Sequence, residues 1–160
     1  MKILIFTEGT ILMHKGALGL TRDEIIKQLR NHQGNPRDYA SYIPIGKSVL
    51  KLNNWANAGA EIIYLTSRKK PAEVEAIRNV LNMYGFPQGR LLFRHGKQAY
   101  KDIAEVLLPD VLVEDDCESI RGSKQMTITN VEPTIKNRIK SLVVKEFGGV
   151  DLLPDKIESL

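Results

Sequence analysis

The sequence contains a single cysteine among its 160 residues and no long run of apolar residues. Cys117 alone cannot form a disulfide within the chain, so nothing in the composition indicates an oxidising compartment. No apolar run approaches the ~18 residues that a membrane-spanning helix needs, and the opening run Met1–Phe6 is too short for a signal peptide. These absences argue against a disulfide scaffold and a membrane protein, and cytoplasmic is the default expectation.

Neither sign of charge dominates the sequence, which has 23 Lys and Arg residues against 19 Asp and Glu residues, a net charge of +4. The basic residues are scattered among acidic ones, except in the segment Lys136–Lys145. Proteins that bind single-stranded nucleic acid interleave basic with aromatic residues, and this chain shows no such interleaving. We therefore expect a solvated surface or an anionic small ligand, with nucleic-acid binding through Lys136–Lys145 as the alternative.

Short apolar runs alternate along the chain with segments of helical periodicity. The predicted strands cover residues 2–6, 61–67, 90–94, 110–116 and 125–131, and the predicted helices residues 21–31, 47–59, 71–85, 97–108 and 133–148. Strands that are separated by helices form a mostly parallel sheet with helices on both faces. The sequence thus predicts an α/β, three-layer, Rossmann-like fold with a five-stranded sheet.

The chain is long enough for one domain spanning residues 1–160. The segment between the first strand and the helix at 47–59 is longer than a simple crossover requires, so residues 11–45 have room for a small lid. Residues 34–46 are rich in Gly, Pro, Asn and Asp and predict a loop. We expect a minimal cap or none.

Polar residues follow three of the predicted strands, at the points where the chain leaves the sheet. They are Thr7-Glu8-Gly9-Thr10, Thr66-Ser67-Arg68 and Glu114-Asp115-Asp116. Ligands of parallel sheets bind beyond the carboxyl ends of the strands. Hydroxyl groups, backbone amides and an arginine suit an oxyanion, and clustered carboxylates suit Mg²⁺. The alternative for the three acids is that they cap the turn after the fourth strand.

These motifs, in this order over residues 2–131, resemble the haloacid dehalogenase superfamily, chiefly its phosphatases. The first motif of that family, an apolar strand followed by Asp-x-Asp-Gly-Thr, is matched by Phe6-Thr7-Glu8-Gly9-Thr10. The second motif, a strand ending in Thr or Ser, is matched with Thr66 at the phosphate-binding position. Lys101 fits the lone lysine of the third motif best, with Lys97 as the alternative, and the fourth motif matches Val111–Asp116.

The resemblance implies a small phosphorylated or other anionic ligand and a Mg²⁺ ion. Its implied ligand-binding residues are Thr7, Gly9, Thr10, Thr66, Ser67, Arg68 and Lys101, and its implied metal ligands are Asp115 and Asp116.

The first motif departs from the family pattern at both aspartates. In the family the first Asp is the nucleophile and a metal ligand, and the second is the general acid and base. Phe6 has no lone pair for either task, and Glu8 can transfer protons but carries its carboxylate one methylene farther out. We therefore expect a protein of hydrolase ancestry that keeps an anion pocket but lacks aspartyl-phosphate chemistry.

Two alternatives remain open at this point. One is a Mg²⁺-dependent phosphoester hydrolase that uses metal-activated water, with Glu8 as the base. The other is a non-enzymatic module that binds nucleic acid or protein.

Overall fold

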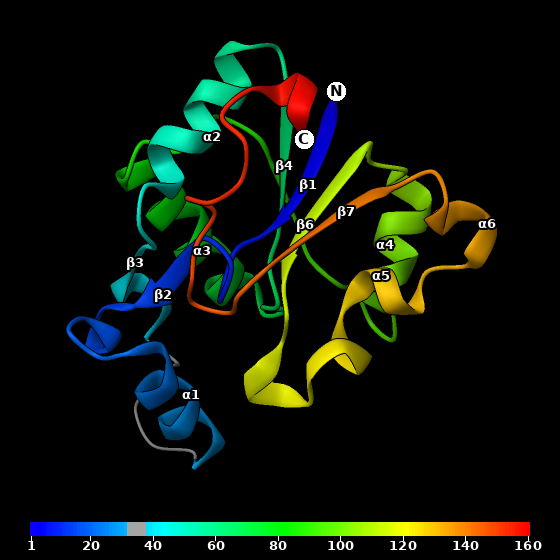
Figure 1. Ribbon diagram of the computed structural model, residues 1–160. Helices are drawn as coiled ribbons and strands as arrows, with labels where there is room; N and C mark the ends of the chain where they lie inside the picture. The colour runs from blue at the N-terminus through cyan, green and yellow to red at the C-terminus, as the bar shows by residue number, and fades with distance from the viewer. Residues whose placement is uncertain (32–37) are drawn as a thin grey trace.

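Five parallel strands form the central sheet of the protein (Figure 1). The computed structural model describes residues 1–31 and 38–160. The strands follow the spatial order β5-β4-β1-β6-β7. Their bounds are Lys2–Phe6 for β1, Glu61–Leu65 for β4, Arg90–Leu92 for β5, Val111–Asp115 for β6 and Lys140–Val144 for β7. The three-layer α/β fold that the sequence predicts is confirmed.

Helices cover both faces of this sheet (Figure 1). On one face lie α2 (Ser48–Asn57) and α3 (Pro71–Met83), and on the other α4 (Tyr100–Leu107), α5 (Thr127–Asn130) and α6 (Pro133–Lys136). Because β1 is buried on both faces, its side chains form an unbroken apolar run, with Ile3 and Ile5 packing on the first face and Leu4 on the second. Within the described residues, none of the helices has the length and apolar character needed to cross a bilayer.

Local sequence signals define where several helices begin. The helix α1 (Arg22–Arg30) opens with a capping box, in which the Thr21 side chain accepts the amide of Glu24 and the Glu24 carboxylate accepts the amide of Thr21. Pro71 stands in the first turn of α3, where its missing N–H costs no hydrogen bond. These two helices begin where the sequence predicts them.

The strand predicted at residues 125–131 is wrong, because α5 occupies most of that segment. The reason lies in a distant strand: the Glu114 carboxylate accepts the amides of Thr127 and Ile128 at 2.7 and 2.9 Å. These amides belong to the first turn of α5, so a carboxylate from β6 caps the helix. A cap that comes from another element leaves no mark in the local pattern.

The helix predicted at residues 133–148 is also wrong. Only α6 is helical there, and residues 140–144 form β7, the fifth strand of the sheet. The β-branched Val143 and Val144 favour a strand, and the exposed edge of β6 supplies its pairing partner. The basic segment Lys136–Lys145 is therefore split between a short helix and a strand, and the basic helix behind the nucleic-acid alternative does not form.

The segment between β1 and α2 leaves the sheet and forms a small excursion beside it (Figure 1). The strands β2 (Leu12–His14) and β3 (Tyr42–Pro44) pair antiparallel, and α1 lies between them in the chain. The loop predicted at residues 34–46 therefore contains β3, while residues 34–37 lie outside the described residues. The suggested lid within 11–45 stays a prediction.

The chain after β7 packs back onto α2 through buried polar contacts. The Lys51 ammonium donates to the backbone oxygen of Leu153 and to the Asp155 carboxylate, both at 2.6 Å. The indole Nε1 of Trp55, a fully buried residue, donates to the backbone oxygen of Pro154 at 3.0 Å. These contacts fasten the last residues to the face of the sheet that α2 covers.

We expect Trp55→Phe to lower the free energy of unfolding by about 2–4 kcal/mol, because it removes the hydrogen bond to Pro154 and leaves a cavity at a fully buried position. Urea unfolding measures the change. The control is Tyr84→Phe, at the exposed end of α3, which we expect to change stability by only a few tenths of a kcal/mol. Equal effects of the two substitutions would contradict the anchoring role of Trp55.

Candidate functional site

A cavity of about 740 Å³ lies at the carboxyl ends of the central strands. Its lining includes Phe6 and Glu8 after β1, Arg68 after β4, and Asp115 at the end of β6. The turn after β1 thus lies beside the ends of β4 and β6, since β1 pairs with both strands. The structure brings the three polar strand ends of the sequence together at one edge of the sheet.

The carboxylate of Glu8 accepts hydrogen bonds from the donor groups that follow β4. Its Oε1 accepts the Thr66 hydroxyl at 2.6 Å and lies 3.2 Å from Nε of Arg68. Its Oε2 accepts the Thr7 hydroxyl at 2.5 Å and the backbone amide of Ser67 at 3.2 Å. The groups that the sequence assigns to an external anion therefore hold a carboxylate of the chain itself.

Arg68 is fixed in this position by further contacts. Its guanidinium donates to the Tyr39 hydroxyl at 2.5 Å and lies over the Tyr39 ring, 4.7 Å from the centroid. Burial opposes the charge of Arg68, but Glu8 and Tyr39 outweigh it and raise the pKa of the guanidinium. The side chain is thus a permanent cation whose charge Glu8 already balances.

Phe6, the last residue of β1, makes an aromatic contact in the cavity. Its ring packs edge-on against Tyr100 at the start of α4, with the centroids 5.0 Å apart and the planes at 75°. The guanidinium carbon of Arg94, which follows β5, lies 3.9 Å from the centroid of the Tyr100 ring. This part of the cavity therefore offers aromatic surface and a cation.

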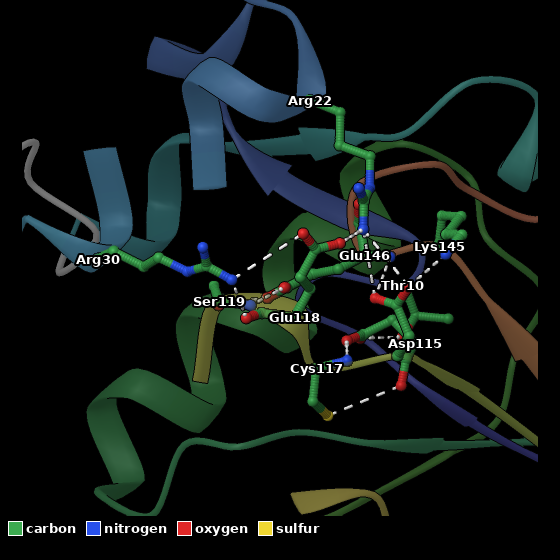
Figure 2. A network of polar contacts seen from close by, with 10 residues as sticks. Thr10, Arg22, Arg30, Asp115, Cys117, Glu118, Ser119, Lys145 and Glu146 are labelled. Atoms are coloured by element: carbon green, nitrogen blue, oxygen red, sulfur yellow. Dashed lines mark hydrogen bonds and ion pairs between the residues drawn. The ribbon is translucent and has the colours of Figure 1, made fainter. Parts of the chain in front are cut away.

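Three carboxylates meet at the other side of the site (Figure 2). Asp115, Asp116 and Glu146 each place one oxygen atom within 4.8 Å of those of the other two. Asp115 accepts the Thr10 hydroxyl at 2.8 Å and the Cys117 amide at 2.9 Å. These bonds bring the turn after β1 onto β6.

Gly9 belongs to the same contact. A Cβ atom there would lie 2.9 Å from Oδ2 of Asp115, and the φ angle of Gly9 is +81°. Only glycine fits this close approach without strain.

The three acids of this cluster have different electrostatic environments. Burial raises the pKa values of Asp115 and Glu146, although both carboxylates accept hydrogen bonds. The pKa of Asp116 is lowered: burial opposes ionisation, but the Glu146 amide and the cations Lys145 and Arg22 outweigh it. Cations therefore balance the negative charge of Asp116, whereas burial disfavours the charged forms of Asp115 and Glu146.

Two arginines of α1 reach this side of the site (Figure 2). Arg22 pairs with the Glu118 carboxylate at 2.5 Å and with Asp116 at 3.4 Å, and its Nε donates to the backbone oxygen of Glu146 at 2.8 Å. Arg30 donates to the backbone oxygen of Glu118 at 2.9 Å. These contacts tie the excursion between β2 and β3 to the strand ends of the sheet.

The cluster fits a divalent cation in its donor type, because Mg²⁺ takes carboxylate oxygens. Asp115, Asp116 and Glu146 supply such oxygens close together. Phe6, however, contributes none, and Nζ of Lys145 already lies 3.2 Å from Asp116. A cation at this cluster would compete with Lys145 and Arg22 for Asp116.

The two lysines considered for the third motif lie in different places. Lys101 lines the cavity, but its Nζ is 3.7 Å from both Asp102 and Glu105 of its own helix. Lys97 is exposed and is not part of the cavity lining. Of the two, Lys101 is the one positioned at the cavity.

Three residues of the site were missed at the sequence level: Arg94, Tyr100 and Glu146. Arg94 follows β5 at the same edge of the sheet, so the rule that located the other strand ends could have found it. Glu146 follows β7, and the incorrect helix prediction concealed it. Tyr100 carries no sequence signal, because its role depends on packing against Phe6.

The comparisons with known proteins establish the fold. No protein-family model matches the sequence, and no curated protein matches it. Among solved structures, the class C acid phosphatase from Bacillus anthracis with tungstate bound aligns with a TM-score of 0.58 at 15% identity, over 92% of this chain and 68% of that chain. A chain of the Pnkp1/Rnl/Hen1 RNA repair complex aligns with a TM-score of 0.55 at 14% identity, over 90% of this chain and 42% of its own length.

The fold is haloacid-dehalogenase-like. The family resemblance seen in the order of the strand-end motifs is therefore confirmed at the level of the fold. At these identities the likeness extends to the fold alone, so the chemistry of the site depends on its own residues.

We expect Asp115→Asn to gain stability relative to wild type as the pH rises from about 4 to about 7. The ordinary pKa of an aspartate is about 3.9, and burial raises that of Asp115. The stability that protonation of Asp115 contributes is therefore present below about pH 4 and lost as the pH rises through the raised pKa. Asparagine carries no such charge, can accept the Cys117 amide and can donate to the Thr10 hydroxyl.

Thermal unfolding of both proteins across this pH range measures the difference, which we expect to grow steadily with pH. The matched control is Glu75→Gln on the exposed side of α3, whose stability relative to wild type should not change with pH in this way. A difference between Asp115→Asn and wild type that is constant across the range would contradict the assignment.

Proposed function

We propose that this protein binds a small phosphorylated or other anionic ligand in the cavity and does not catalyse aspartyl-phosphate chemistry. The observation that carries the proposal is Phe6, whose ring contacts Tyr100 at the place where the family holds its nucleophile. A phenyl ring can neither attack phosphorus nor coordinate a metal. The protein is thus of hydrolase ancestry in its fold and a binding protein in its function.

The contacts of Glu8 support the proposal that the site can bind an anion. Two hydroxyl groups, the Ser67 amide and the Arg68 guanidinium converge on one carboxylate, the arrangement that stabilises an oxyanion. The cavity of about 740 Å³ lies within the range of about 300–1,000 Å³ that is typical of small-molecule sites. An organic anion therefore has both room and donors in this site.

A second function, Mg²⁺-dependent phosphoester hydrolysis by metal-activated water, is favoured by the acidic cluster. Asp115, Asp116 and Glu146 would hold the ion, and Glu8 across the cavity would act as the base. The contacts of Glu8 count against this role, because its two oxygens already accept from Thr7, Thr66 and the Ser67 amide and pair with Arg68.

A phosphatase assay over a panel of phosphate monoesters, with and without Mg²⁺, separates the two functions. We expect no turnover by wild type, and Mg²⁺-dependent turnover by the double variant Phe6→Asp/Glu8→Asp, which restores both carboxylates of the first motif. Phe6→Leu is the matched control and should stay inactive. Mg²⁺-dependent hydrolysis by wild type that is lost in Asp115→Asn would establish the second function instead.

A second prediction concerns the resident carboxylate. We expect Glu8→Gln to bind inorganic phosphate at least about tenfold more tightly than wild type, because glutamine keeps the side-chain shape but no longer competes for Arg68 or repels an anion. Isothermal titration calorimetry measures the dissociation constants. Glu75→Gln is the control for a lost negative charge outside the cavity, and equal affinity of wild type and Glu8→Gln would contradict the competition.

A further inference from the structure

Arg94 is a cation of the cavity that has no acidic partner. Within residues 1–31 and 38–160 it forms no ion pair with a carboxylate, and its Nε atom is buried without a hydrogen-bond partner. A buried donor without an acceptor is costly, and it is satisfied when an acceptor enters the site. Arg68, in contrast, is already paired with Glu8.

The aromatic wall defines the orientation of the Arg94 guanidinium. With its central carbon 3.9 Å from the Tyr100 centroid, the group lies over the ring and also interacts with the Tyr100 hydroxyl, and its N–H bonds lie in its own plane. A guanidinium held in this way presents its donors in a fork that matches a phosphate or carboxylate. Phe6 extends the same wall through its edge-on contact with Tyr100.

Several other charged groups of the lining are already engaged, while Lys124, also a lining residue, is exposed. Glu114 accepts the first amides of α5, Glu8 is held after β4, and Lys101 lies near two acids of its own helix. Arg94, a cation without an acidic partner, therefore lies beside the apolar surface of Tyr100 and Phe6. Such a pair of surfaces suits a ligand that has an anionic end and an apolar body.

We infer that Arg94 anchors the anionic group of the ligand and that the wall of Phe6 and Tyr100 contacts a flat apolar or aromatic group attached to it. This inference rests on the proposed function and names its ligand class: a small organic phosphate or carboxylate, in preference to inorganic phosphate. It also gives Phe6 a task, because the side chain that removes the nucleophile supplies apolar contact area to the ligand. The anion does not need to displace Glu8.

Isothermal titration calorimetry with phenyl phosphate and inorganic phosphate tests the inference. We expect wild type to bind phenyl phosphate at least about tenfold more tightly than inorganic phosphate, without release of phenol. Arg94→Gln should weaken phenyl phosphate binding at least about tenfold, while the matched control Arg90→Gln should leave it unchanged, since exposed Arg90 on β5 pairs with Glu61 outside the cavity. Phe6→Ala should remove most of the preference for the phenyl group.

The outcomes distinguish an error in the role of Arg94 from an error in the proposed anion-binding function. If Arg94→Gln binds phenyl phosphate as wild type does, the anchor is wrong while anion binding stands. If neither wild type nor Glu8→Gln binds either probe, both proposals are wrong. If wild type releases phenol, the non-catalytic function is wrong, and a higher KM in Arg94→Gln would still support the anchor.

Circular dichroism confirms that each variant is folded, and Arg94→Lys provides a second test. This variant keeps the charge but loses the flat fork of donors, so we expect an affinity between those of wild type and Arg94→Gln. A loss in Arg94→Lys equal to that in Arg94→Gln, with unchanged stability, would confirm that the guanidinium geometry is required. Full retention of affinity by both variants would overturn the anchor.

Discussion

The site depends on the position of β1 in the middle of the sheet. Because β1 pairs with β4 on one side and β6 on the other, the turn that follows it lies between the ends of both neighbours. Thr10 then bonds to Asp115 of β6, and Glu8 bonds to Thr66 after β4. Any change that displaced β1 along its neighbours would separate all of these groups at once.

Side chains of the protein itself contact one another at the carboxyl ends of the central strands of this fold. The donors after β4 hold the chain's own Glu8, and the rings of Phe6 and Tyr100 pack together at the end of β1. The bonds between Glu8 and these donors are charge-assisted and stabilise the folded chain. Arg94, which has no acidic partner among the described residues, is a further cation of the cavity, and its Nε atom is buried without a hydrogen-bond partner.

The acidic side of the site has a structural role that does not require a ligand. Asp115 joins the turn after β1 to β6, and Glu146 accepts the backbone amide and the hydroxyl of Ser119. Arg22 and Arg30 of α1 both contact Glu118 near the cavity. These contacts hold the excursion between β2 and β3 against the sheet. Burial of Asp115 and Glu146 destabilises their charged forms, so the stability of this cluster depends on pH.

The sequence by itself determined the α/β class, the first four strands of the sheet, the capped start of α1 and the three polar strand ends, because periodicity, capping residues and chain order are local properties. Only the tertiary structure decided the rest. The last strand forms at 140–144 because β6 offers an edge, and α5 forms because Glu114 caps it from β6. Glu8 also bonds to Thr66, a residue far away in the chain, and Arg94 lies over the ring of Tyr100. These contacts depend on the folded chain, and no local sequence pattern encodes them.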